Sequence, residues 1–115
     1  MIKSKIKIAG KDVNVAWCYA TEIAFHNYTG LPVEKFNIND PTHVLYLIIA
    51  SVFAYYNATG AELPIEDADI MNDATPQEIA GAILKVIDLQ KEWIKEPESD
   101  DSQKEEAGEE NEKKQ

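Results

Sequence analysis

The residues of this chain best suited to covalent catalysis are its single cysteine and its two histidines. Cys18 precedes a predicted helix, whose dipole would lower the pKa of the thiol, and His26 or His43 could serve as its base. No spacing in the sequence places either histidine beside the cysteine, and a free cysteine is among the residue types most often buried. We therefore expect Cys18 to be a packing residue, and a small enzyme that uses Cys18 is the less favoured alternative.

The sequence contains no pattern typical of a metal or cofactor site. The acidic run from Asp67 to Asp73 lacks the glycine and the closing glutamate of a calcium loop. Acidic residues are favourable in the first turn of a helix without any ligand. The five glycines are dispersed, so no phosphate-binding loop is expected. The sequence thus predicts a protein that is not an enzyme and has no cofactor, no metal and no catalytic residues.

The charge of the chain argues against nucleic acid as a partner. The 11 basic residues are all lysine, and with 21 acidic residues the net charge is −10. Without arginine the chain lacks the side chain that dominates phosphate and base recognition, and an acidic protein gains little from counterion release. Residues 96–115 contain nine acids and three lysines, a charge of −6, which leaves −4 for residues 1–95. An acidic module that inhibits a host nucleic-acid enzyme is an alternative, although −4 is low for a DNA mimic.

The composition predicts one globular domain over residues 1–95 and a disordered acidic tail over residues 96–115, because the tail has no large apolar residue. The N-terminus has no apolar run of signal-peptide length, so we expect a cytoplasmic protein. The longest uncharged run, Val44 to Tyr56, has thirteen residues, whereas about 20 are needed to span a bilayer. No membrane contact is therefore expected.

The N-terminal segment predicts an antiparallel β-hairpin over residues 2–17. Apolar and polar residues alternate on both sides of Gly10, as in half-buried strands. A two-residue loop of Gly10 and Lys11 would place Ile8 opposite Val13. An isolated hairpin is only marginally stable, so its apolar face must pack on the helices.

Four helices are expected, at about residues 19–29, 41–58, 66–72 and 76–94. Gly30 suits a left-handed cap after the first helix, and Asp40 followed by Pro41 begins the second. Thr75 and Glu78 form a capping box at the start of the last. The second helix is apolar nearly all round, so it should be the central one. The predicted fold is α+β and mainly α, with the hairpin packed on a bundle of three to four helices.

Helical wheels predict which sides of the first and last helices face the core. In the first helix, Tyr19 and Ile23 belong to an apolar surface that covers more than half of the circumference. In the last helix, an apolar stripe runs from Ile79 to Ile94 and leaves Leu84 alone on the polar side.

The order of these elements resembles the small tail assembly chaperones of long-tailed, siphovirus-type bacteriophages and prophages. The resemblance covers about residues 3–95 and rests on Lys5–Val15, Ile23–Gly30, Val44–Tyr56 and Thr75–Ile94. It implies a non-enzymatic cytoplasmic protein, absent from the mature virion, that binds the long helical tape measure protein and keeps it soluble during tail tube assembly.

The resemblance also implies two product lengths, since members of the family often have a longer form made by a programmed frameshift. Such a form would connect the chaperone to the tail tube protein. The pair Lys113-Lys114 is compatible with an A-rich slippery sequence, at which the frameshift would occur. A chaperone of this kind needs exposed apolar contacts, and the apolar second helix would also allow self-association. The apolar second helix, and the positions of Phe25 and Leu84 off the main stripes, suggest the partner contacts that we expect: Phe25, Tyr28, Tyr55, Tyr56 and Leu84.

Overall fold

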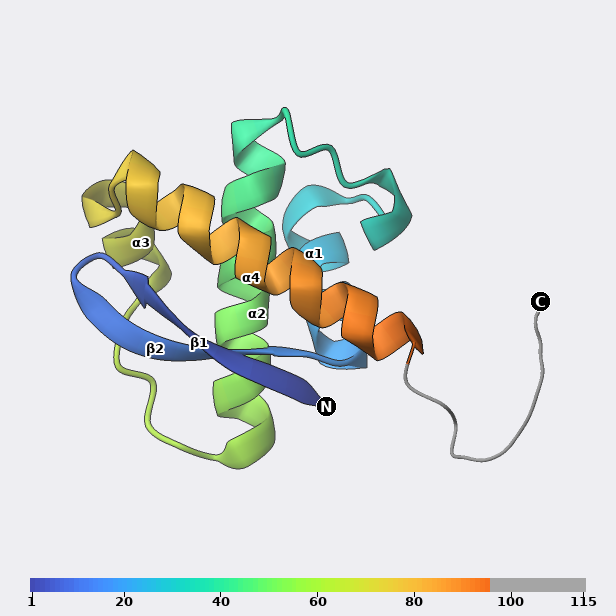
Figure 1. The fold of residues 1–115 in the computed structure, drawn as a ribbon, viewed down its shortest axis with the longest axis horizontal. Helices are drawn as coiled ribbons and strands as arrows, with labels where there is room; N and C mark the ends of the chain where they lie inside the picture. The colour runs from blue at the N-terminus through green and yellow to red at the C-terminus, as the bar shows by residue number, and fades with distance from the viewer. Residues whose placement is uncertain (96–115) are drawn as a thin grey trace.

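A computed structural model describes residues 1–95. Figure 1 shows a hairpin and a set of crossing helices. The elements are β1 (Ile2–Ile8), β2 (Lys11–Trp17), α1 (Tyr19–Thr29), the short 3-10 helix η1 (Val33–Lys35), α2 (Pro41–Thr59), α3 (Asp67–Asp73) and α4 (Pro76–Lys95). The predicted α+β, mainly helical fold is confirmed. The tail predicted to be disordered, residues 96–115, lies outside the described residues.

Helix α2 is the centre of the fold, as predicted. At its start the Asp40 carboxylate accepts a hydrogen bond from the Thr42 N–H at 2.9 Å, and at its end Gly60 adopts φ 73°. Between these caps α2 packs against β2, α1, α4 and α3, and in Figure 1 α4 crosses in front of it. Because neighbours cover α2 on several sides, its apolar residues are buried around most of its circumference.

The hairpin has the predicted faces, but its loop is shifted by one residue. Ala9 and Gly10 form the turn, with φ 51° and 79°, and Ile8 lies opposite Lys11 while Ile6 lies opposite Val13. The predicted pairing of Ile8 with Val13 is therefore wrong: the register differs from the prediction by two residues. Because side chains alternate between the two faces with a period of two, every side chain still lies on its expected face.

The reason for the shift lies in a helix distant in sequence. The Glu78 carboxylate accepts hydrogen bonds from the N–H groups of Ala9 at 2.9 Å and Gly10 at 3.0 Å. A left-handed conformation costs a non-glycine residue about 1–2 kcal/mol, and these two bonds offset that cost at Ala9. The turn is thus selected by a contact with α4.

Helix α1 presents a narrower face to the core than the wheel predicted. Thr21 and Phe25 are buried, whereas Tyr19 and Ile23, expected to pack inside, are 70% and 60% exposed. The Thr21 hydroxyl donates to the Ala16 carbonyl at 2.8 Å and so ties α1 to the end of β2. A polar residue occupies the inner face because the backbone of β2 supplies its hydrogen-bond partner.

Helix α4 begins with the predicted capping box. The Thr75 hydroxyl accepts from the Glu78 N–H at 3.1 Å, and Glu78 accepts from the Thr75 N–H at 3.0 Å. Leu84 is exposed as expected, at 61%. Ile94, predicted on the apolar stripe, is 69% exposed. In this last turn the neighbouring Trp93, and not Ile94, is half-buried, and its ring lies 5.3 Å from that of Tyr19 in α1.

Candidate functional site

Phe25, the first of the predicted partner contacts, belongs to the core. Its side chain is fully buried, and its ring meets the Phe36 and His43 rings at centroid distances of 6.1 and 5.8 Å. The prediction that Phe25 contacts a partner is wrong, because the side of α1 that carries Phe25 faces α2 and the segment before it.

Tyr28 remains accessible, at 37% exposure. Its ring stacks on that of Tyr46 in α2, with centroids 5.1 Å apart and planes 12° apart. Partial burial, the nearby Asp67 carboxylate and Tyr46 together raise the pKa of the Tyr28 hydroxyl above 10.0. Tyr28 is therefore neutral at physiological pH and presents one edge of a stacked aromatic pair.

Tyr55 and Tyr56 lie on a different side of α2 from this pair. Their rings contact each other edge to face at 4.9 Å, and the Tyr56 hydroxyl accepts from the Asn14 N–H at 3.1 Å. Tyr56 thus connects α2 to the outer edge of β2. Leu84 lies on α4, so the four accessible positions do not converge on one surface.

Replacing Tyr56 with phenylalanine should lower the free energy of unfolding by about 0.5–1.5 kcal/mol, because the Asn14 N–H loses its acceptor. Urea unfolding measures the loss, and amide exchange at Asn14 should become faster. Tyr55→Phe is the matched control, since its hydroxyl bonds to no other described residue. Equal stability of the two variants would show that Tyr56 is free for a partner.

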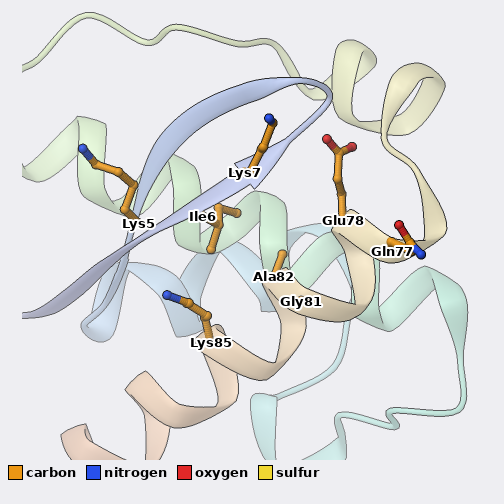
Figure 2. A pocket seen from close by; sticks show the side chains of 8 residues that line it. All are labelled: Lys5, Ile6, Lys7, Gln77, Glu78, Gly81, Ala82 and Lys85. Atoms are coloured by element: carbon orange, nitrogen blue, oxygen red, sulfur yellow. The ribbon is translucent and has the colours of Figure 1, made fainter.

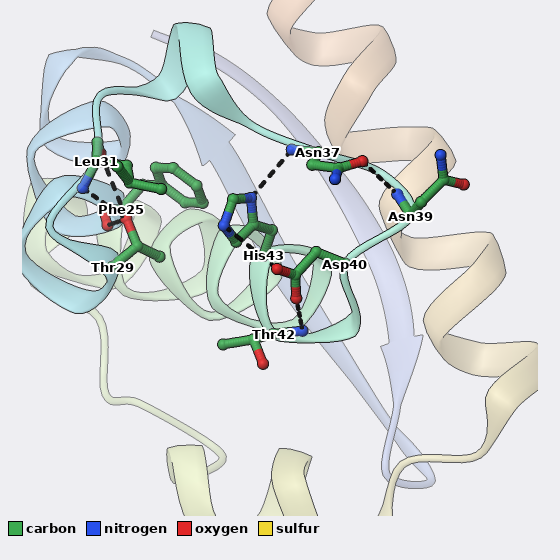
Figure 3. Close-up of polar contacts among 8 residues, drawn as sticks. All are labelled: Phe25, Thr29, Leu31, Asn37, Asn39, Asp40, Thr42 and His43. Carbon is green, nitrogen blue, oxygen red and sulfur yellow. Dashed lines mark hydrogen bonds and ion pairs between the residues drawn. The ribbon is translucent and has the colours of Figure 1, made fainter.

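The three catalytic candidates are not assembled into a site. Cys18 caps α1, and His26 is eight residues further along the chain, about 12 Å along the helix. His43 Nδ1 accepts from the Asn37 N–H at 3.0 Å, and its Nε2 lies 3.6 Å from Asp40 Oδ2 (Figure 3). Because both ring nitrogens are occupied, His43 fixes the loop that enters α2.

Groups that bind metals do not cluster in residues 1–95. No three histidine, cysteine, aspartate or glutamate side chains there are close enough to hold an ion. Across the same residues, no helix has both the length and the apolar character needed to cross a membrane.

An apolar cleft of about 380 Å³ is the best candidate for a binding site. It lies where the loop before α2, the first turns of α2, α3 and the start of α4 meet. Ile38 and Met71 are 51% and 44% exposed at this cleft. Its lining, which we call the α2–α3 cleft, is Ile38, Asn39, Pro41, Val44, Leu45, Ile70, Met71, Ala74 and Ile79.

The chemistry of the α2–α3 cleft suits an apolar partner. Asn39 is the only polar residue of its lining, and no charged side chain takes part. Methionine adapts its shape to irregular partners, and exposed apolar surface of this kind is typical of protein interaction sites. The cleft can therefore receive apolar side chains of another protein without leaving a charge desolvated.

A second, smaller cleft of about 240 Å³ lies on α1 and η1. The exposed Tyr19 and Ile23 line it, but so do Glu22, His26 and Glu34. Burying these polar groups under an apolar partner would be costly. This cleft is a poorer site for an apolar partner and a useful control.

The α2–α3 cleft does not follow from the helical and strand periodicity of the sequence. Ile38 stands between two asparagines in a loop, and Met71 stands in an acidic helix of one or two turns. Neither residue belongs to a long apolar stripe, so periodicity predicts no site at either position. The sequence feature that could have indicated this cleft is an isolated large apolar residue inside a polar segment.

Comparison of the chain with protein-family models, with curated proteins and with solved structures finds no match.

Proposed function

We propose that this protein is a non-enzymatic tail assembly chaperone of a long-tailed bacteriophage or prophage. It binds the long helical tape measure protein in the bacterial cytoplasm, keeps it soluble and supports tail tube assembly, without becoming part of the mature virion. The observation that carries the proposal is the solvent-open α2–α3 cleft, which has an uncharged and mostly apolar lining.

An amphipathic helix is the partner that fits this cleft. Such helices bind through apolar side chains spaced three or four residues apart, which enter a groove while their polar side stays in water. The cleft offers Ile38 and Met71 as exposed contacts and the half-buried Leu45 and Ile79 beneath them. The net charge of −10 would keep the complex soluble.

The test is co-expression with the tape measure protein encoded in the same operon, followed by pull-down. The double variant Ile38→Glu/Met71→Glu should abolish capture, because it places two charges in the apolar site. Both side chains are about half exposed, so the variant should remain folded. Circular dichroism and thermal unfolding establish that it does.

Matched controls separate the α2–α3 cleft from other exposed apolar positions. Ile23→Glu lies in the smaller cleft and Leu84→Glu on the outer face of α4, and both residues are about 60% exposed. Both variants should retain capture. Loss with Leu84→Glu alone would favour the surface predicted from sequence, and a wild-type protein that captures no tape measure protein would contradict the function itself.

A further inference from the structure

A groove of about 340 Å³ separates β1 from α4 on another part of the molecule. Ile6 and Ala82 form its apolar floor, and Figure 2 shows lysines leaving β1 and α4 around them. Its lining, which we call the lysine groove, is Lys5, Ile6, Lys7, Gln77, Glu78, Gly81, Ala82 and Lys85.

The lysine groove is positively charged. Lys5, Lys7 and Lys85 surround it, and none of the three forms an ion pair with another residue of the described part of the chain. Its only acid, Glu78, already accepts hydrogen bonds from the backbone N–H groups of Ala9, Gly10 and Thr75. The groove therefore favours a negatively charged occupant.

The groove also contains an unpaired strand edge. Ile8 and Lys11 flank the two-residue turn and form a hydrogen-bonded pair, and such pairs alternate along a hairpin. Lys5 and Lys7 consequently turn their backbone N–H and C=O groups away from β2. Asn14, which lies opposite Lys5, supports this assignment, because its N–H points outward to the Tyr56 hydroxyl.

There is room for a chain beside this edge. Gly81 faces the groove from α4, and a Cβ atom at that position would meet no other atom within 4 Å. Glycine in a helix interior costs about 1 kcal/mol relative to alanine. The position thus keeps the groove open where a larger side chain would narrow it.

The acidic segment 96–115 begins close enough to reach the groove. Strand β1 and helix α4 run in opposite directions, because the turn after β1 meets Glu78 at the start of α4. Lys95 ends α4 ten residues beyond Lys85, about 15 Å along the helix. Twenty residues of chain can span up to about 66 Å, so the segment can turn back to Lys85 and beyond.

We propose that segment 96–115 occupies the lysine groove of its own chain. Its nine carboxylates face Lys5, Lys7 and Lys85, and the segment covers the open edge of β1. Tethering raises its local concentration to the millimolar range, so even weak ion pairs suffice. Covered in this way, the edge is protected from pairing with strands of other proteins. The inference does not depend on the proposed function.

Paramagnetic relaxation enhancement on the full-length protein tests the contact. A nitroxide is attached to Ser102→Cys in a Cys18→Ser background, which leaves one thiol. Enhancement should be strong at the amides of residues 5–7 and 77–85. Raising the salt concentration to about 0.5 M, where the Debye length is about 4 Å, should reduce it about threefold or more.

Two variants and a matched control test the partners of the segment. Lys5→Gln/Lys85→Gln removes two charges from the groove and should reduce the enhancement, while Lys35→Gln/Lys91→Gln removes two exposed charges elsewhere and should not. Gly81→Glu puts a carboxylate in the groove and should displace the segment. It also improves helix propensity, so it should fold well.

Three results would overturn the proposal. The first is the absence of enhancement at residues 5–7 and 77–85 in the full-length protein. The second is enhancement that salt and the groove variants leave unchanged. The third is enhancement at the amides of molecules that carry no nitroxide when they are mixed with molecules that carry one, since this would show that the segment binds a second copy.

Discussion

Replacing Phe25 with alanine should lower the free energy of unfolding by about 3–5 kcal/mol. The side chain is fully buried among Phe36, His43 and the core of α2, so its removal leaves a cavity that the neighbouring rings cannot fill. Small domains have about 5–15 kcal/mol of stability in total. The variant should therefore unfold at a much lower urea concentration than the wild-type protein.

Ile23→Ala is the control for this prediction. Ile23 lies on the same helix two residues earlier and is 60% exposed, so its loss should change stability by no more than about 0.5 kcal/mol. If Phe25→Ala were as stable as Ile23→Ala and yet failed to bind a partner, Phe25 would be the surface contact that the sequence predicted.

Replacing Glu78 with glutamine should lower the melting temperature by several degrees and speed amide exchange at Ala9 and Gly10. A single carboxylate accepts hydrogen bonds from three backbone N–H groups, two in the hairpin turn and one at the start of α4. Glutamine has one acceptor oxygen and no charge, so it can satisfy only some of these donors. Differential scanning calorimetry and hydrogen exchange measure the two effects.

The difference between wild type and Glu78→Gln should depend on pH. The hydrogen bonds from Thr75, Gly10 and Ala9 hold the pKa of the Glu78 carboxyl below its usual value of 4.5. Because the folded protein favours the ionised form, the stabilisation is complete above that value and disappears as the pH falls through the folded-state pKa. The two melting temperatures should therefore converge in acid.

Glu92→Gln is the matched control for Glu78→Gln. Glu92 is an exposed glutamate on the same helix, so the change in net charge is the same while no turn loses an acceptor. Its melting temperature should stay close to that of the wild type from neutral to acidic pH. A difference between wild type and Glu78→Gln that persisted at low pH would show that the ionised carboxylate is not what stabilises the turn.

Much of the secondary structure could be predicted because its signals are local. Asp40 and Pro41 begin α2 as predicted, and Thr75 with Glu78 begins α4, since a cap needs only backbone groups within a few residues. The alternation of β1 and β2 fixed which side chains face inward, and the structure has these faces.

Predictions that required a neighbour were less successful. The wheel of α1 could not choose between Phe25 and Ile23, because both are apolar and the positions of α2 and β2 decide which is covered. The period of α4 places Ile94 on the apolar stripe, but in this last turn only the neighbouring Trp93 is half-buried, with its ring 5.3 Å from that of Tyr19 in α1. Apolar side chains favour burial, but the arrangement of the neighbouring elements determines whether a given side chain is buried.

The sequence by itself therefore determined the type and limits of the elements, the uneven charge and the central place of α2. The tertiary structure decided the hairpin turn, where Glu78 selects Ala9 and Gly10, and it decided where the accessible surfaces lie. The α2–α3 cleft joins Ile38 to Met71, and the lysine groove joins Lys5 to Lys85, across long stretches of chain. Such sites depend on the packing of elements that are distant in the sequence, and short-range sequence patterns do not predict that packing.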